Sequence, residues 1–399
     1  MKNNYLLLNL ALVVLLFASC QADDTADIII TDNSTTTINN GGGSGGTDPT
    51  FIEIGGTKTE DVTLQAGTDY VLTEALTMTN GTTLTIPAGT VIRANNGAGV
   101  YIAIAQGAKI NAEGTSAQPI VLTSNETTPN AGDWGGLIIL GKAPINSVAG
   151  GDSTSSSEIG GLPYGGSNAG DDSGIIKYLR VEYSGGAADA SSENNGFSFY
   201  GVGNGTTVQY IQAFEGKDDG IEFFGGTVNA DFISVINCQD DSVDWTEGFS
   251  GVLTNVYIQH GVSHDKGFEC DGFNTDIGNN SSPLFFAKPS VSNVTIVGRG
   301  SATGNEAVRL RAGTQGIFTN MLIQGFEKGF KIVGDGAASP TGQGVLDGDL
   351  SATNITFEDV LEKLVNDTTA VFGETDFITG DGNGTGADYE SWKTGWTRN

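Results

Sequence analysis

The stretches Asp218-Asp219-Gly220-Ile221-Glu222-Phe223 and Asp240-Asp241-Ser242-Val243-Asp244-Trp245 are two copies of one phrase that recurs along this chain. Four further copies begin at residues 194, 265, 305 and 327, so that successive copies are 24, 22, 25, 40 and 22 residues apart. A repeat of about 20–45 residues is typical of stacked coils, each of which buries its apolar face against its neighbours. The phrase therefore predicts a solenoid.

A second type of apolar strand precedes the phrases. Its copies lie at residues 178–181, 208–211, 232–235, 256–258, 294–297, 321–323 and 355–357. Each repeat therefore carries at least two short strands, separated by turns rich in Gly, Asn and Asp, and the 399 residues include 60 Gly. Short strands between such turns fit coils better than a sandwich of long hairpins.

Each repeat with its two strands would form one coil, or rung, of a solenoid. Over residues 60–358 these rungs resemble the right-handed parallel β-helix superfamily. The earlier segments LTIPAGT (84–90), PIVLTS (119–124) and DWGGLIILG (133–141) are similar to those of a group of secreted or lipid-anchored β-helices of the Bacteroidota. The resemblance implies an all-β, right-handed parallel β-helix over 51–358. Residues 359–399 are predicted to cap the open end of the coil, and the pattern of residues 358–365 predicts a short helix. It implies no particular activity.

The first 20 residues are expected to lie outside the fold. Lys2 precedes an apolar run from Tyr5 to Ala18, which is short for a membrane span and ends beside the lone Cys20. This pattern resembles a bacterial lipoprotein signal and implies an acylated Cys20; an ordinary secretory signal is the alternative. Residues 21–50 read as an acidic, Gly-rich tether. Its Asp23-Asp24 pair resembles an export tag and implies lipid anchoring in the outer membrane, exposed at the cell surface.

Overall charge and cysteine content narrow the possible partners. A formal charge of −29 argues against nucleic acid, whose binding needs clustered Lys and Arg. Cys238 and Cys270 lie beside apolar strand positions and are expected to be buried free thiols rather than a zinc site.

Strand alternation places a column of acids on the outside of the coil. The fourth and sixth positions of the phrase are apolar and should point inward, and the fifth should point outward. The outward column reads Ser198, Glu222, Asp244, Glu269, Arg309 and Lys331. Neighbouring rungs are about 4.8 Å apart, and like charges at that distance repel by about 1 kcal/mol in water.

A calcium ion would offset this repulsion, because calcium prefers several oxygen ligands in a flexible site. The predicted ligands come from the outward column and from the turn beside it: Asp218, Glu222, Asp240, Asp244, Asp265 and Glu269. The alternative is that Asp recurs at these turns because it tolerates their backbone angles.

An enzymatic interpretation rests on a resemblance to polygalacturonases. Their ordered motifs could be met by Asp219, Asp240, Asp241, His264, Arg309 and Arg311. The resemblance implies inverting hydrolysis of an acidic polysaccharide, with acids that protonate the leaving oxygen and activate water. The sequence departs from the family at Lys217-Asp218-Asp219, Ser263-His264-Asp265 and Arg309-Leu310-Arg311. A calcium-assisted lyase would need a base, and Arg309 is the one outward Arg beside the acids.

A non-enzymatic binding lipoprotein is the leading interpretation. The strand face could hold an extended glycan, with Trp245 and Phe249 stacking on sugar rings. Such a protein could serve adhesion, or pass a nutrient to an outer-membrane transporter. His260 and His264, the only histidines, could instead join the acids in a transition-metal site. A purely structural stalk or adhesin is the third interpretation.

Overall fold

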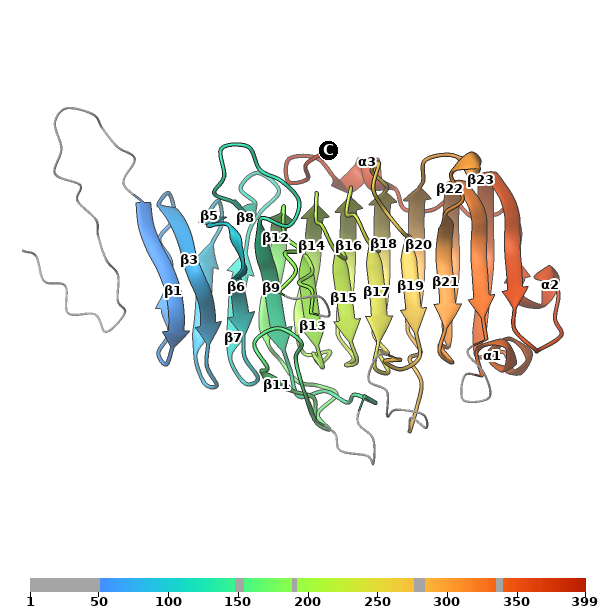
Figure 1. Ribbon diagram of the computed structural model, residues 1–399, viewed down its shortest axis with the longest axis horizontal. Coiled ribbons are helices and arrows are strands. Elements are labelled where there is room, and N and C mark those ends of the chain that lie inside the picture. Colours follow the sequence, from blue (N-terminus) through green and yellow to red (C-terminus); the bar gives the residue numbers. More distant parts are fainter. Residues whose placement is uncertain (1–50, 148–153, 189–191, 276–283, 335–339) are drawn as a thin grey trace, which may run out of the picture. The chain divides into compact units, whose positions relative to one another are not determined.

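The computed structural model describes residues 51–147, 154–188, 192–275, 284–334 and 340–399. Within these ranges the chain winds as a right-handed parallel β-helix, and Figure 1 shows the rungs side by side from β1 to β23. The predicted signal segment 1–20, with Cys20, and the tether 21–50 lie outside the described residues. No helix in the described ranges is long and apolar enough to cross a membrane.

The strands stack on three faces, and long strands bend from one face to the next. The first face consists of β2 (Val62–Thr63), β4 (Thr83–Pro87), β7 (Lys109–Glu113) and the first parts of β12 (Gly174–Glu182), β14 (Thr207–Phe214), β16 (Asn229–Ile236), β18 (Val252–Gln259), β20 (Ser290–Val297), β22 (Gly316–Val333) and β23 (Leu350–Asp367). The second face consists of their following parts and of β1 (Phe51–Lys58), β3 (Asp69–Met78), β5 (Val91–Ala94) and β8 (Ile120–Ser124).

The third face carries the recurring phrase. It consists of the ends of β1, β3, β22 and β23, and of β6 (Gly97–Ile104), β9 (Trp134–Leu140), β13 (Phe197–Tyr200), β15 (Ile221–Phe224), β17 (Val243–Thr246), β19 (Phe268–Asp271) and β21 (Glu306–Arg311). Outside the faces lie the antiparallel pair β10 (Ser155–Ser156) and β11 (Pro163–Tyr164), and the short helix η1 (Ser301–Thr303).

The corner between the first and second faces explains why Asn recurs at one position of successive rungs. One residue in each rung from β12 to β23 adopts a left-handed backbone there, with φ between 50 and 59°. The residues at this corner are Tyr178, Tyr210, Phe232, Asn255, Asn293, Asn320 and Asn354. Asn tolerates this conformation because its short side chain can bond locally. The rings of Tyr210 and Phe232 stack at 4.2 Å, and the Asn320 amide donates to Asn293 at 2.9 Å.

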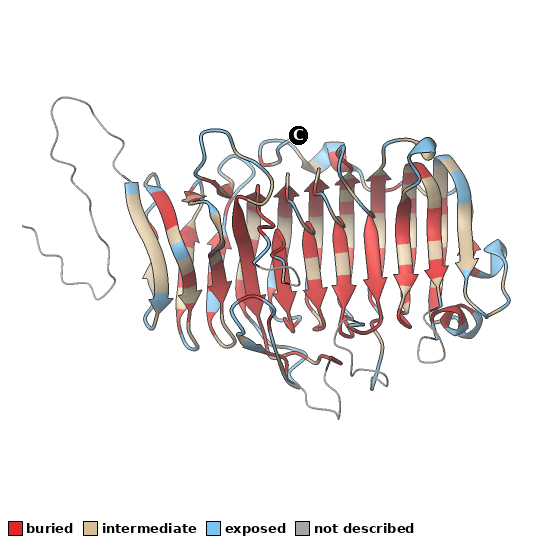
Figure 2. Ribbon diagram, in the orientation of Figure 1, coloured by how far each residue is buried: buried red, intermediate tan, exposed pale blue. Residues whose placement is uncertain are grey.

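The core is a continuous apolar column inside the coil. Figure 2 shows mostly buried residues in the third-face strands from β9 to β19, whereas the ends of the stack at β1 and β23 are less buried. Stacked rings fill this column, with Phe199 over Phe223 at 5.2 Å and Phe223 over Phe249 at 4.4 Å. Cys238 and Cys270 are free and buried, as the sequence predicts.

The predicted helix at 358–365 is wrong, because that segment belongs to strand β23. Val360 and Leu364 pair with Phe326 and Phe330 of the preceding rung. Their spacing also fits one helical face, and strand pairing with the exposed end of the stack overrides that local pattern. The coil therefore extends to Asp367, beyond the predicted boundary at 358.

The C-terminal residues cover the last coil and then run back along the side of the helix. Helices α1 (Thr341–Asp347) and α2 (Glu374–Phe377) lie at the end, where Phe377 packs on Phe330, and β24 (Ile378–Thr379) pairs with β23. Helix α3 (Tyr389–Trp392) and the C-terminus then lie over the β12–β18 region (Figure 1). Arg398 forms an ion pair with Glu182 at 2.8 Å. Only the first part of this segment acts as the predicted cap.

Candidate functional site

Strand register forms the predicted outward column on the third face. Glu222 pairs with Ser198 and Asp244, and Glu269 pairs with Asp244 and Arg309. Lys331 follows Arg309 on the next rung. The column is less exposed than the sequence analysis expected, since Ser198 is 3% exposed and Glu269 is 8% exposed. Turn residues and neighbouring side chains cover it.

Two turn aspartates link successive rungs. The Asp219 Oδ1 atom accepts a hydrogen bond from the Asp241 backbone N–H at 2.9 Å. Asp241 Oδ1 accepts one from the Lys266 backbone N–H at 2.7 Å. A carboxylate that bonds the next rung satisfies a buried donor at the turn. This arrangement supports a structural reason for Asp at these two positions, alongside any role in binding.

The column and the turn together form the carboxylate cluster, which we define as Glu193, Asp218, Asp219, Glu222, Asp240, Asp241, Asp244 and Glu269. Oxygen atoms lie within 4.8 Å of one another in four overlapping groups. One of these groups is Asp219, Glu222 and Asp244. Calcium–oxygen distances are about 2.3–2.6 Å, so two ligands of one ion can be up to about 5 Å apart. The donors and their spacing fit a calcium ion.

Basic side chains neutralise only one end of the cluster. Lys266 Nζ lies 2.9 Å from Glu269 and 3.4 Å from Asp241. Arg311 contacts Glu269 and Asp271, both at 2.5 Å. Within the described residues, no ion pair involves the rest of the cluster, namely Glu193, Asp218, Asp219, Glu222, Asp240 and Asp244.

The uncompensated acids hold their protons more tightly than usual. Burial raises the pKa of Asp218 to about 8, and repulsion from Glu193 and Asp240 adds to the effect. Burial also raises the pKa values of Asp219 and Glu222 well above the usual range, with Asp244 as the strongest repelling neighbour of each. The pKa of Asp244 is raised by burial and by Glu269, although Arg311 opposes the shift.

Asp244 also has an oxygen atom without a partner. Its Oδ1 atom is buried and accepts no hydrogen bond from the described residues. By contrast, the nearby Glu222 Oε2 accepts a hydrogen bond from the Asn195 amide at 2.6 Å. A buried acceptor without a donor costs about 1–3 kcal/mol. A cation held between Asp219, Glu222 and Asp244 would remove that cost.

Five of the six residues predicted as metal ligands belong to the cluster: Asp218, Glu222, Asp240, Asp244 and Glu269. Asp265 does not, because its side chain is 52% exposed and contacts Lys266 at 2.5 Å. Glu193, which groups with Asp218 and Asp240, was not among the predicted metal ligands. Its position directly before the first copy of the phrase is the one signal that could have indicated it.

The structure brings three of the six residues named for hydrolysis together, and the other three contact side chains of the protein itself. Asp219, Asp240 and Asp241 meet within 4.8 Å. His264 instead lies against His260, with ring centroids 4.1 Å apart and ring planes tilted by 33°. The two arginines are held by acids of the protein itself, Arg309 by Glu306 at 2.8 Å and Arg311 by Glu269 and Asp271.

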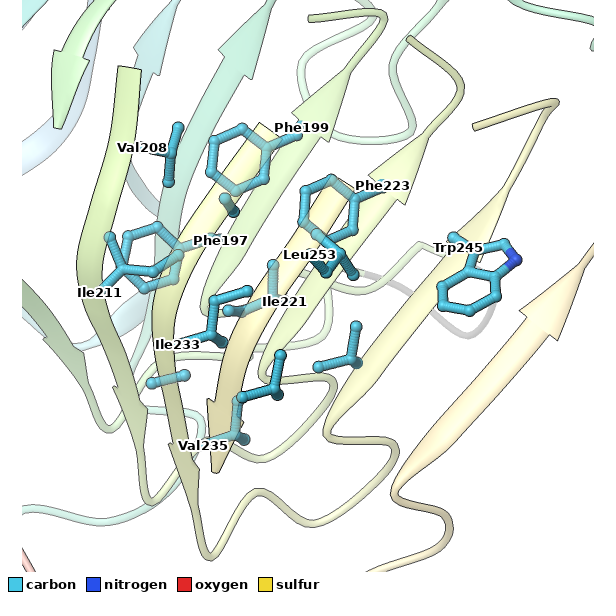
Figure 3. Close-up of a cluster of buried hydrophobic side chains, with 14 of the residues drawn as sticks. Phe197, Phe199, Val208, Ile211, Ile221, Phe223, Ile233, Val235, Trp245 and Leu253 are labelled. Carbon is cyan, nitrogen blue, oxygen red and sulfur yellow. The ribbon is translucent and has the colours of Figure 1, made fainter. Parts of the chain in front are cut away.

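The prediction that Trp245 and Phe249 stack on a ligand is wrong. Both side chains are 0% exposed and belong to the core. Figure 3 shows Trp245 among the buried apolar side chains. The sixth position of the phrase points inward, as the alternation rule requires, and the Trp245 indole N–H donates to Thr314 at 3.1 Å inside the protein.

Comparison with known proteins assigns the chain to a family. No curated protein matches it. Residues 56–397 match the pectate-lyase like beta helix domain family. This range spans every rung from β2 to β23 and nearly all of the C-terminal segment. The chain therefore belongs to the family of pectate-lyase-like β-helix domains.

Proposed function

We propose that this protein binds calcium at Asp219, Glu222 and Asp244 and, through the bound ion, an acidic polysaccharide. The single observation that carries the proposal is the buried Asp244 Oδ1, which has no hydrogen-bond partner among the described residues and lies in a group of acids with oxygen atoms within 4.8 Å. Acids that face one another without a basic partner favour a cation over an empty site.

The polysaccharide part of the proposal follows from family and charge. Membership of a pectate-lyase-like family supports a role with polysaccharides. The uncompensated acids would repel a polyanion, and a calcium ion would reverse that repulsion and offer open coordination positions to the carboxylates of a sugar chain. Binding should therefore require calcium.

The hydrolase alternative has less support. The oxygen atoms of Asp219, Asp240 and Asp241 lie within 4.8 Å of one another. Inverting enzymes separate their two carboxyl groups by about 6.5–9.5 Å to admit a water. The ion pairs of Arg309 and Arg311 also occupy the groups that would orient an acidic substrate. A binding protein, with calcium as its cofactor, fits the cluster better.

The calcium site is tested by calorimetric titration of the metal-stripped protein. We expect wild-type protein to bind calcium, and Asp244→Asn and Glu222→Gln to weaken binding at least tenfold. Asp265→Asn is the matched control, because it makes the same change at an acid of the turn before β19, outside the oxygen groups. Wild-type protein that binds no calcium, or an Asp265→Asn variant as weak as Asp244→Asn, would contradict the proposed ligand set.

The polysaccharide is tested with polygalacturonate. We expect retention of the protein on the immobilised polymer with calcium, and release by a chelator. The same mixture is assayed for chain cleavage over hours. Binding without cleavage supports a binding protein, whereas new chain ends that depend on Asp240 or Asp241 would establish the enzymatic alternative.

We further propose that the protein is anchored in the outer membrane through an acylated Cys20 and displays the β-helix at the cell surface, where an outer-membrane transporter could receive its ligand. The support is the apolar run before Cys20 and the Asp23-Asp24 pair after it. Cys20→Ala should abolish incorporation of labelled fatty acid and release the protein from membranes. Incorporation that survives this change would refute the anchor.

A further inference from the structure

The last residues of the chain form a strap along the outside of the second face. We define the strap as residues 384–398, which include helix α3. It starts beside β23 and ends beside β12, and Figure 1 shows α3 and the C-terminus over the rungs between them. The strap therefore brings Trp396 against Arg180, which lies 216 residues earlier in the chain.

One column of side chains guides the strap. Strand register places one residue of each rung from β12 to β23 at equivalent positions of the second face: Arg180, Gln212, Ser234, Tyr257, Thr295, Leu322 and Thr356. The residues on either side of Arg180, Leu179 and Val181, are buried in the core, so strand alternation points the column outward. The strap follows this column from Thr356 back to Arg180.

Three late rungs hold the first part of the strap by hydrogen bonds. The Thr356 hydroxyl donates to the Gly384 carbonyl at 2.7 Å. The Asn320 side chain, in the rung before it, accepts a backbone N–H of the strap at 2.7 Å. The Ala387 backbone N–H donates to the Thr295 hydroxyl at 3.0 Å. These bonds attach the strap to β23, β22 and β20.

Tyr389 connects the strap to two middle rungs. Its ring stacks on Tyr257 of β18, with centroids 3.7 Å apart. Its hydroxyl lies 3.2 Å from the hydroxyl of Ser234 of β16, and Ser234 is 0% exposed. One residue of the strap therefore contacts two successive rungs and covers a polar group of the column.

The end of the strap is bound to the rungs of β14 and β12. Gln212 holds both backbone groups of Arg398: its side-chain oxygen accepts from the N–H at 2.7 Å, and its side-chain nitrogen donates to the carbonyl at 2.8 Å. The Arg180 guanidinium donates to the Trp396 carbonyl at 2.6 Å. The Arg398 side chain forms the ion pair with Glu182. Trp396 is 0% exposed, so this end of the strap is packed against the coil.

These contacts change how the coil can open. In a solenoid each rung contacts only its neighbours, so a group of rungs at one end can open while the others stay folded. The strap adds contacts that connect rungs which are not neighbours. If a rung between β12 and β23 opens, the column loses its alignment, and the contacts of the strap with the other rungs are lost as well.

We propose that the strap joins the rungs from β12 to β23 into one cooperative unit, and that the earlier rungs can open separately. In the described part of the chain, the ion pair and ring contacts of the strap end at the rung of β12, which sets the boundary. The carboxylate cluster lies between β12 and β20 in the sequence and therefore inside the unit. The strap would keep its facing acids together while no cation is bound.

Native-state hydrogen exchange of the full chain, in chelator, tests the proposal. In wild-type protein we expect the best-protected amides of β12, β14, β20 and β22 to have protection factors within threefold of one another. Those of β3 and β4 should be at least tenfold lower. Trp396→Ala should make β12 and β14 at least tenfold less protected than β20 and β22, because the strap would stay bound only at the later rungs.

Two further variants separate loss of the strap from a general loss of stability. The Arg398 side chain is 44% exposed, and Arg398→Gln removes its ion pair but keeps the backbone groups that bond to Gln212. This change should make β12 and β14 at least threefold less protected than β20 and β22. Tyr101→Ala, which removes a half-buried ring from the third face, is the control and should leave the four strands equally protected.

Three results would overturn the proposal. The first is a wild-type protein in which the protection of β12 and β22 differs by more than threefold. The second is equal protection of these strands in both Trp396→Ala and Arg398→Gln. The third is a separation in Tyr101→Ala as large as that in Trp396→Ala. Because exchange is measured in chelator, none of these results depends on the calcium site.

Discussion

The third face has two regions that differ in whether their acidic side chains form ion pairs with basic side chains. In the rungs of β15 and β17, Glu222 and Asp244 face each other with no ion pair among the described residues. In the rungs of β21 and β22, Glu306 contacts Arg309 at 2.8 Å and Lys331 at 3.2 Å. Burial raises the pKa of Glu306, but the hydrogen bonds and charges of Arg309 and Lys331 outweigh it and lower the pKa below its usual value. The same strand geometry thus holds a network of ion pairs within the protein at β21 and β22. At β15 and β17 it leaves acids that a bound cation would neutralise.

The largest effect should come from breaking the paired region. Arg311→Met would leave Glu269 and Asp271 without their shared guanidinium. Loss of one partner from a buried pair costs about 3–5 kcal/mol, and we expect about 3 because Arg311 is itself partly exposed. Denaturant unfolding measures this loss. Arg93→Met removes an exposed pair with Asp69 and should cost less than about 1 kcal/mol; equal losses would show that burial of the acids is unimportant.

In the unpaired region, Asp244→Asn should instead increase the stability of the calcium-free protein. The change removes one of the facing charges and supplies a donor to neighbouring carboxylates, so calcium-free protein should become more stable by about 1–3 kcal/mol. Calcium should stabilise the wild type and no longer stabilise the variant. Thermal unfolding in chelator and in calcium measures both effects. A variant that is less stable in chelator would mean that Asp244 has a partner within the folded protein.

The pH dependence of stability should distinguish calcium-free from calcium-bound protein. Asp218 has a folded pKa of about 8, above the value near 4 of an unfolded Asp. Because the folded state binds more protons, stability should fall as the pH rises from about 4 to about 8. The pKa values of Asp219, Glu222 and Asp244 are raised in the same direction. Each kcal/mol lost should lower the melting temperature of this 399-residue protein by less than the roughly 2–4 °C expected for chains of 150–250 residues.

Calcium should flatten this profile, since a bound cation favours the ionised carboxylates. Melting temperatures between pH 5 and pH 8, with calcium and with chelator, provide the measurement. A calcium-free melting temperature that rises across this range would contradict the raised pKa values and with them the description of the cluster as uncompensated.

The smallest effect should come from Asp265→Asn. Asp265 is mostly exposed and is one of three acids that contact Lys266, so its loss leaves Asp241 and Glu269 paired with that lysine. An exposed pair contributes about 0–1 kcal/mol. Denaturant unfolding should detect a change of less than about 1 kcal/mol. A larger loss would show that Asp265 belongs to the cluster, as the sequence analysis expected.

The pattern of residues along the chain was sufficient to predict the fold and the order of the outward column. Apolar residues at the fourth and sixth positions of a repeated phrase can be buried together only if each copy is a strand stacked on the next, and this constraint also aligns Glu222 with Asp244 and Glu269. The prediction of a helix at 358–365 failed because spacing alone does not reveal that an open rung is available for pairing.

Which acids are paired with basic side chains, and which polar groups are buried, depends on how the folded chain brings separate rungs and turns together. Lys266 reaches three acids and Asp265 turns outward, and neither contact follows from the spacing of residues along the chain. The structure also placed Trp245 in the core and buried the ring of His260. Periodicity records which side of a strand a residue occupies, whereas pKa values and ligand sites depend on distances between side chains from different rungs and turns.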